Sequence, residues 1–206
     1  VYVASSFYDM PFVDGAIDAA MMVRVIHHVE DVPALLGEVA RVLAGGGTYV
    51  LEFASERHLK AILRYALRRQ MWNPFDREPV EFAEMNFDFH PDWMRNRLGE
   101  AMFHVKHTRT VSHFRLPLLK KAVPANLLAA VDGLCQPTGG WWQLTPSVFI
   151  QCASGKEATA APTAQLFRCP SCASSDLVES TEVLVCLNCS ARWPIEDGIY
   201  TFKADS

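Results

Sequence analysis

Four cysteines near the end of the chain have the spacing of a metal site. They form two C-x-x-C pairs, Cys169 with Cys172 and Cys186 with Cys189, separated by thirteen residues. Each pair can present two thiolates to one cation, and two pairs complete a tetrahedron. This pattern favours zinc, and a zinc ion closed in by four thiolates is structural, with no open position for a substrate. Iron in a redox site uses the same ligands and is the runner-up.

Disulfide bonds are the alternative for these four cysteines. The sequence opens without a basic and then apolar leader, so we expect a cytoplasmic, reducing compartment, which disfavours disulfides. A segment of about forty residues also has too little core to fold alone, so a bound metal would supply folding energy. The two remaining cysteines, Cys135 and Cys152, are expected to be buried apolar residues.

Composition divides the chain at residues 153–165, which read ASGKEATAAPTAQ. Small polar residues of this kind bury too little surface to order themselves and are typical of a linker. We therefore expect a body at residues 1–152 and a small module at residues 166–206. The net charge of −4 does not indicate nucleic-acid binding, although it does not exclude it, and no apolar stretch is long enough to span a membrane.

The body begins with the pattern of an α/β protein. The apolar run Ile17–Val23 predicts a central parallel strand, and Asp31 and Pro33 predict the start of a helix that ends at Gly45–Gly47. Thr48–Phe53 predicts the next strand. A strand, a helix and a strand of these lengths form a βαβ unit, which indicates a doubly wound α/β sheet.

The region at residues 54–90 is where we expect substrate choice to be decided. Residues 56–70 predict an amphipathic helix with Leu59, Leu63 and Leu67 facing inward and an arginine-rich outer side, which is a solvated face or an anion-binding one. An unusually dense group of aromatic residues follows, which either roofs a pocket or packs an irregular segment. These aromatic residues are Trp72, Phe75, Phe82, Phe87, Phe89 and Trp93.

Residues 1–55 resemble the middle of a class I S-adenosylmethionine-dependent methyltransferase of the type 11 group. The segments MPFVDGAID and VIHHVEDVPALLGEVARVLAGGGTYVL carry this resemblance. It implies a partial Rossmann-like doubly wound sheet in which Val1–Ser5 is the third strand and residues 105–114 and 147–152 form the closing antiparallel hairpin. The glycine-rich turn after the first strand and the acidic residue after the second are not in the sequence. We therefore expect a fragment that lacks the first two strands.

The same resemblance implies three contacts to S-adenosylmethionine. Ser6 stands where the family usually carries an acidic residue for the adenine amino group, Phe7 would cover the adenine, and Val23 would approach the amino-acid end of the cofactor. His27 and His28 titrate near neutrality, but we expect them to be structural. Methyl transfer depends mainly on alignment, so the sequence identifies no catalytic base.

Residues 166–202 resemble the small zinc-ribbon activator subunits of RNA and protein methyltransferases. The segments CPSC, LNC and WPIEDGI carry the resemblance, with Tyr200 in place of the usual proline. The resemblance implies a zinc ribbon that does not catalyse but binds a methyltransferase. We expect methyl transfer to an unidentified acceptor, with this fragment inactive alone. The alternatives are a non-catalytic scaffold or regulatory partner that docks through the ribbon, and an iron redox module.

Overall fold

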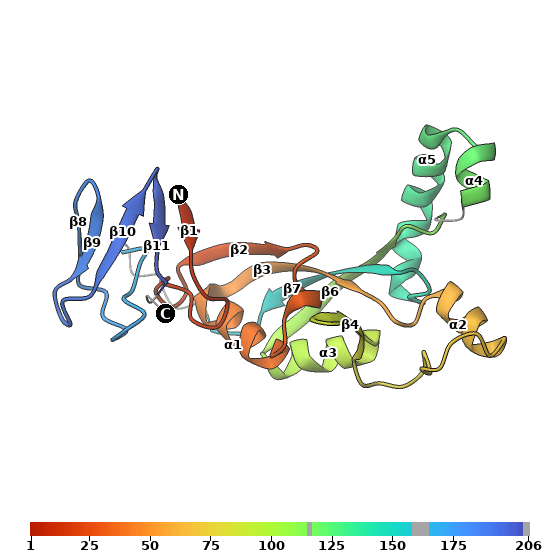
Figure 1. Ribbon diagram of the computed structural model, residues 1–206, viewed down its shortest axis with the longest axis horizontal. Coiled ribbons are helices and arrows are strands. Elements are labelled where there is room, and N and C mark those ends of the chain that lie inside the picture. Colours follow the sequence, from red (N-terminus) through yellow and green to blue (C-terminus); the bar gives the residue numbers. More distant parts are fainter. Residues whose placement is uncertain (115–116, 158–164, 204–206) are drawn as a thin grey trace.

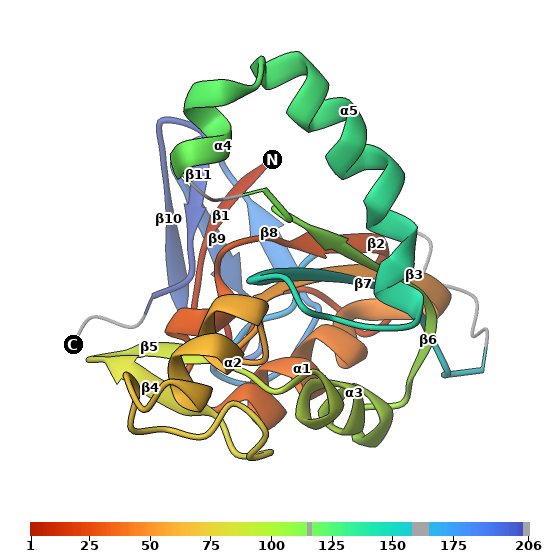
Figure 2. The ribbon, with the colours of Figure 1, turned by 90° about the vertical axis from the view of Figure 1, so that its right-hand side faces the viewer.

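The computed structural model describes residues 1–114, 117–157 and 165–203, and it has the expected α/β architecture. The body is built on a four-stranded sheet in the order β2-β3-β7-β6 (Figure 1). Its strands are β2 (Ile17–Met22), β3 (Leu43–Ala54), β7 (Ser147–Ser154) and β6 (Phe103–Val111). Helices α1 (Val32–Val42) and α3 (Pro91–Glu100) lie on the same face of this sheet (Figure 2).

The βαβ unit predicted from the sequence is confirmed. β2 pairs in parallel with β3, and α1 connects them. The Asp31 carboxylate caps α1 by accepting a hydrogen bond from the Ala34 backbone N–H at 2.9 Å. β7 runs antiparallel to β3 and β6 runs antiparallel to β7, which forms the expected closing hairpin. In the described residues β2 is an edge strand, although its apolar sequence predicts a central one.

The hydrophobic core lies between the sheet and the two helices. Alternate residues of β3 point into it, because successive side chains of a strand lie on opposite faces. Cys152 is buried here as expected, whereas Cys135 is only half-buried. The largest fully buried side chains include Tyr49, Phe53, Phe89, Ile26, Leu35 and Leu36.

The C-terminal module is a five-stranded sheet in the order β1-β11-β10-β9-β8. The strands that it contributes are β8 (Leu177–Glu179), β9 (Val183–Cys186), β10 (Arg192–Glu196) and β11 (Ile199–Thr201). A turn at Asp197 and Gly198 joins β10 to β11, and both residues have positive φ, as tight hairpin turns require. Most of the predicted linker, residues 158–164, lies outside the described residues.

The first strand of the chain belongs to this module's sheet. β1 (Tyr2–Ala4) pairs in parallel with β11, with Tyr2 opposite Ile199. The family resemblance places this strand in the body sheet, and the described structure differs. The physical reason is that β11 is paired with β10 on one edge and offers β1 its other edge. The backbone groups of β1 are paired by β11 instead.

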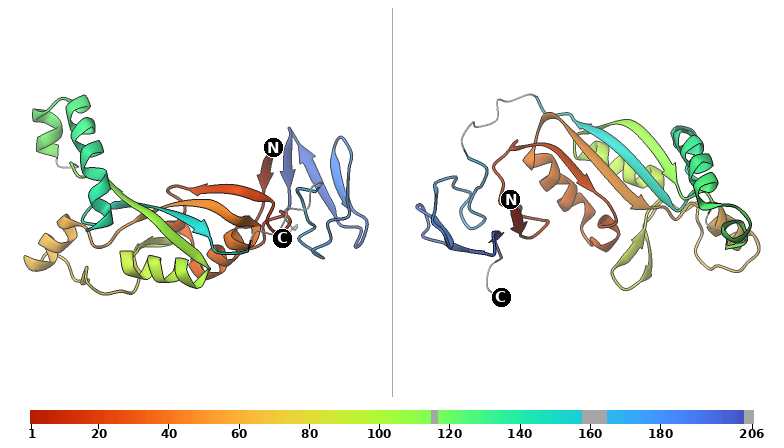
Figure 3. Two further views of the ribbon diagram at one scale, coloured as in Figure 1. Left: turned by 180° about the vertical axis from the view of Figure 1, so that it is seen from behind. Right: turned by 90° about the horizontal axis from the view of Figure 1, so that it is seen from above.

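Helices α2, α4 and α5 lie at the end of the body sheet that is away from the ribbon (Figure 3). The helix predicted over 56–70 is shorter, α2 (Leu59–Ala66), and its expected inward face is wrong: Leu59, Leu63 and Leu67 are more than half exposed and only Ala61 is buried. No described helix is both long enough and apolar enough to cross a membrane. The remaining elements are η1 (Ile26–His28), β4 (Val80–Ala83), β5 (Asn86–Asp88), α4 (Pro117–Ala122), α5 (Ala125–Cys135) and η2 (Gln136–Gly140).

Candidate functional site

A pocket of about 610 Å³ lies beyond the carboxyl ends of β2 and β3, and we call it the strand-end pocket. Parallel α/β sheets bind their ligands at this edge, because the loops that follow the strands diverge there. The pocket collects side chains from the loop after β2, from the β4–β5 hairpin and from the β6–β7 region. Its walls include Val23, His27, Glu52, Phe82, Asp88 and Phe149.

Glu52 holds the walls of the strand-end pocket together. Its carboxylate accepts a hydrogen bond from the Arg24 backbone N–H at 2.9 Å and another from the Ser147 hydroxyl at 2.5 Å. Arg24 has φ of 59°, a left-handed conformation that costs free energy for a residue with a side chain. The buried Glu52 carboxylate therefore fixes a strained loop after β2 against the start of β7.

The β4–β5 hairpin supplies the acidic wall of the pocket. Asp88 and Asn86 lie on β5, and Phe82 lies on β4. Burial raises the pKa of the Asp88 carboxyl to about 6. Asp88 is therefore mostly ionised at pH 7, and its pKa lies closer to neutral pH than that of an exposed aspartate.

A second carboxyl group lies close to Asp88. Glu56 is fully buried, and neither of its carboxyl oxygens has a hydrogen-bond partner among the described residues. Burial, followed by the charges of Asp88 and Asp76, raises the pKa of Glu56 to about 8. Glu56 is therefore mostly protonated at pH 7, because an ionised carboxylate without partners is costly in the interior.

The two adjacent histidines have different surroundings. His28 Nδ1 lies 3.1 Å from the Met85 carbonyl oxygen, which fits the structural role expected for it. His27 lines the strand-end pocket, and its buried Nδ1 has no hydrogen-bond partner among the described residues. Burial and the neighbouring His28 lower the pKa of His27, so its imidazole is mostly neutral at pH 7.

The three residues expected at the cofactor do not all gather in one pocket. Val23 lines the strand-end pocket. Ser6 forms an isolated bridge with Asp9, and Phe7 is half exposed. Neither Ser6 nor Phe7 lines any pocket that we describe in residues 1–114, 117–157 and 165–203.

The four cysteines of the ribbon converge as their spacing predicts. Their sulfur atoms lie within 4.8 Å of one another, with 3.6 Å between the sulfurs of Cys169 and Cys189 and the same distance between those of Cys172 and Cys186. These distances exclude disulfide bonds, which are about 2 Å long. Tetrahedral zinc with Zn–S bonds of about 2.3 Å places its sulfurs about 3.8 Å apart. The donor set therefore fits a zinc ion.

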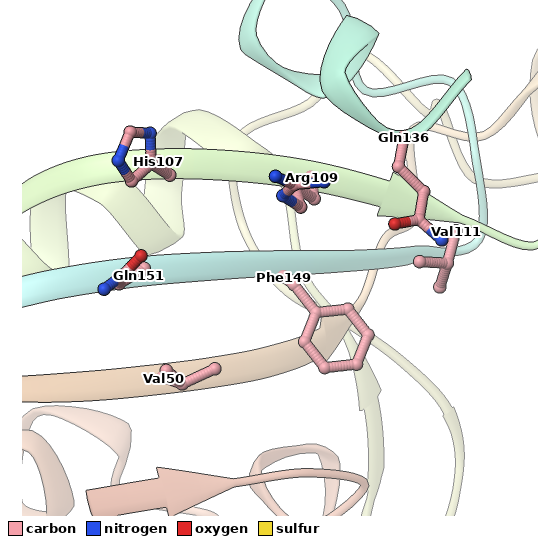
Figure 4. Close-up of a pocket in the computed structure, with 7 residues that line it drawn as sticks. All are labelled: Val50, His107, Arg109, Val111, Gln136, Phe149 and Gln151. Atoms are coloured by element: carbon pink, nitrogen blue, oxygen red, sulfur yellow. The ribbon is translucent and has the colours of Figure 1, made fainter. Parts of the chain in front are cut away.

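Two further pockets lie outside the strand-end pocket. The first, of about 300 Å³, lies on the sheet face opposite α1 and α3 and includes His107, Arg109, Gln136, Phe149 and Gln151 (Figure 4). The second, which we call the α2 pocket, measures about 480 Å³ and includes Arg64, Arg69, Trp72 and Asp88. No described ribbon residue lines any of the three pockets, which separates the cysteine cluster from them.

Sequence reasoning missed the polar walls of the strand-end pocket. Glu52 stands near the end of an apolar strand, and Asp88 follows more than thirty residues later. Their types and spacing match no motif, so they carry no signal of their own. The dense aromatic segment was the only indication, since Phe82 does line the pocket while Phe89 is a core residue stacked on Trp93.

Comparison with known families addresses the first quarter of the chain. Residues 1–51 match a methyltransferase domain. The match includes β1, β2, α1 and most of β3. No protein of curated function matches the chain in sequence.

Several solved structures are similar to the chain, including an S-adenosylmethionine-dependent methyltransferase from Thermotoga maritima (18% identity, TM-score 0.49, 73% of this chain and 62% of that one). A complex that contains the Haloferax volcanii Trm112 methyltransferase activator is 14% identical (TM-score 0.46, 74% and 60%). A Methanosarcina mazei S-adenosylmethionine-dependent methyltransferase is 18% identical (TM-score 0.46, 74% and 66%). The chain thus spans 60% to 66% of the length of these three structures.

Proposed function

We propose that this chain is part of an S-adenosylmethionine-dependent methyltransferase and that the strand-end pocket receives the methyl acceptor. The observation that carries the proposal is the position of the matched segment. Residues 1–51 include β2 and its following loop, which contribute Val23 and His27 to the pocket. Glu52, the next residue after the match, fixes that loop. The segment similar to a methyltransferase thus forms one wall of the largest of the three pockets.

Ser6, Phe7 and Val23 are the residues that we propose for cofactor contact. Tyr8 supports the proposal for Ser6 and Phe7. Its hydroxyl accepts a hydrogen bond from the Asp31 backbone N–H at 3.2 Å, which holds the loop after β1 near the start of α1. S-adenosylmethionine, when bound, supplies a methyl group that is already activated. The protein then has to align the acceptor with it.

Asp88 and His27 are the groups placed to handle the acceptor's proton. Both line the strand-end pocket, and at pH 7 Asp88 is mostly ionised while His27 is mostly neutral. Either group can accept a hydrogen bond from an acceptor N–H or O–H and take up the proton as the new bond to carbon forms. Phe82 and Phe149 would cover the acceptor's apolar surface.

For the ribbon we propose a structural zinc ion on Cys169, Cys172, Cys186 and Cys189, in a module that binds its own body. Arg168 supports the internal docking, because its backbone N–H donates to the Pro11 carbonyl at 2.9 Å and its guanidinium lies 3.3 Å from Asp9. β11 is already paired with β1, so a separate protein partner would meet the ribbon at β8, its outer strand. Binding of a separate partner at β8 is the arrangement that the scaffold alternative requires.

The proposed activity is tested by calorimetric titration of S-adenosylhomocysteine into the complete gene product that contains this chain and, in parallel, into this chain. We expect the complete product to bind and this chain to bind weakly or not at all. Val23→Trp in the complete product should reduce the affinity for S-adenosylhomocysteine at least tenfold, because the larger side chain would occupy space in the strand-end pocket. Val178→Trp, at an exposed position of β8, is the matched control. Absence of binding by the complete product would refute the methyltransferase assignment and favour the scaffold.

A further inference from the structure

The sheet-face pocket, defined by Val50, His107, Arg109, Val111, Gln136, Phe149 and Gln151, has no role in the function proposed above. Helices α1 and α3 cover one face of the sheet, and this pocket lies on the other (Figures 2 and 4). β6 and β7 place its side chains in pairs across the strands: His107 is opposite Gln151, and Arg109 is opposite Phe149. Cross-strand neighbours on one face lie close enough to contact a single small ligand.

The donors of this pocket are free to bind a ligand. Neither the Arg109 guanidinium nor the His107 imidazole makes a hydrogen bond or an ion pair with any of the residues that the structure describes. No carboxylate lines the pocket, and the amides of Gln136 and Gln151 add further donors. Phe149 and Val50 supply an apolar wall beneath these groups. This combination suits an oxyanion attached to a planar apolar group.

Close packing holds the upper wall of the pocket in place. Gln136 begins η2, which lies against β6. A Cβ added at Gly139 would lie 2.7 Å from the Thr110 backbone nitrogen, so only glycine allows this approach. The Gln143 side chain also donates a hydrogen bond to the Gly139 carbonyl. Gln136 is therefore carried on a short helix that is fixed to the strand bearing Arg109.

The sheet-face pocket adjoins the strand-end pocket. Val111 and Phe149 line both of them. The two pockets differ in their carboxylates: the strand-end pocket contains Glu52 and Asp88, beside Arg24 and His27, whereas no carboxylate lines the pocket of His107 and Arg109. A ligand that crosses Phe149 would thus meet donors at one end and proton acceptors at the other.

We propose that the sheet-face pocket binds the oxyanion of a small aromatic methyl acceptor, a phosphate or a carboxylate, whose ring lies on Phe149 and whose methylated end reaches the strand-end pocket. Arg109 is the principal donor, and His107, Gln136 and Gln151 complete the site. The inference rests on the proposed methyltransferase function for the identity of the ligand as an acceptor. The oxyanion site itself rests only on the geometry of β6, β7 and η2.

The test is an NMR titration of this chain with three probes that share one ring: phenyl phosphate, benzoate and benzyl alcohol. We expect the two anions to shift the backbone amides of β6 and β7, and the neutral alcohol to leave them unchanged. The phosphate and benzoate titrations distinguish the two kinds of oxyanion by their relative affinities. Loss of a charge-assisted hydrogen bond, worth about 1.4 kcal/mol or more, should make Arg109→Gln bind about tenfold more weakly.

Lys106→Gln is the matched control, because Lys106 is an exposed cation on the same strand that does not line the pocket. Equal affinities in Arg109→Gln and the parent chain would overturn the proposal, and so would loss of binding in Arg64→Gln, which would move the anion site to the α2 pocket. Binding of a single-stranded oligonucleotide through Arg109 without binding of phenyl phosphate would overturn the small acceptor in favour of nucleic acid. If the phosphate binds but the complete product does not bind S-adenosylhomocysteine, the oxyanion site stands and the methyltransferase function fails.

Discussion

The backbone N–H of Phe202 donates a hydrogen bond to the carbonyl of Ala4 at 2.8 Å, which ties the last described strand of the chain to the first. Phe202 is buried in the small core of the ribbon, where it packs on Trp193 and Phe167. The ribbon core also contains Cys169 and Cys186. Order in β1 therefore depends on the folding of the cysteine module, although about 160 residues separate the two in sequence.

From this relationship we expect removal of the metal ligands to release β1. Cys186→Ser, or chelation of the metal, should unfold the ribbon because the module has little other core. Amide hydrogen exchange at residues 2–4 should then become fast, while the amides of β3 and β7 keep their protection. Cys135→Ser, which lies outside the cluster, is the control and should leave both regions unchanged. Protection of residues 2–4 that survives the loss of Cys186 would contradict the dependence.

Glu56 predicts a pH dependence of stability. Its pKa is raised in the folded state, so the folded chain keeps a proton that the unfolded chain loses. The free energy of unfolding should therefore fall by about 1.4 kcal/mol for each pH unit between roughly pH 5 and 8, where the two states differ by one proton. Glu56→Gln removes this titration.

Urea denaturation at several pH values measures the effect of Glu56. The Glu56→Gln variant should be more stable than the parent chain at pH 8, and the difference should shrink steadily towards pH 5. Glu78→Gln, at an exposed position, should run parallel to the parent chain. A Glu56→Gln curve that also runs parallel would show that the Glu56 carboxyl titrates normally.

Among the surface-facing cations of the body, we expect Arg41 to be the one whose substitution lowers the free energy of unfolding most. Its guanidinium donates to the carbonyls of Phe12 and Met10 at 2.7 and 2.8 Å and forms ion pairs of 2.6 Å with Glu38 and Asp14. Arg41→Gln leaves the Glu38 carboxylate, itself largely buried, without its main partner. This should cost about 2–4 kcal/mol of the free energy of unfolding.

Arg95→Gln is the control for Arg41, since Arg95 lies 4.0 Å from Asp92 in a partly exposed pair and should change stability by less than about 0.5 kcal/mol. Urea denaturation of the two variants at one pH makes the comparison. Equal effects would show that the hydrogen bonds of Arg41 do not hold the loop after β1.

Gly139 and Gly140 offer a direct test of how η2 is seated. A methyl group at Gly139 meets the backbone of Arg109 and Thr110, whereas one at Gly140 meets no atom within 4 Å. Gly139→Ala should therefore destabilise the chain by about 1–3 kcal/mol, and Gly140→Ala should be close to neutral. Thermal unfolding distinguishes them, and similar melting temperatures for the two variants would contradict the close approach of η2 to β6.

The sequence by itself determined the local elements and the cysteine cluster. Ile17–Met22 and Val32–Val42 form the expected strand and helix because apolar spacing and the Asp31 cap are local signals. Each C-x-x-C pair holds its two sulfur atoms close together within four residues. The fold then has to set only the distance between the two pairs. These features depend on neighbours within a few positions of the chain.

Only the tertiary structure decided which strand edges pair and which side chains line the same pocket. The pairing of β1 with β11 follows from which strand edges were open, and the exposure of Leu59 and Leu63 follows from the lack of a described element over α2. The strand-end pocket joins Glu52 to Asp88, and the sheet-face pocket joins Arg109 to Gln136. Such contacts connect residues far apart in sequence through backbone register and burial, which no local pattern of residue types encodes.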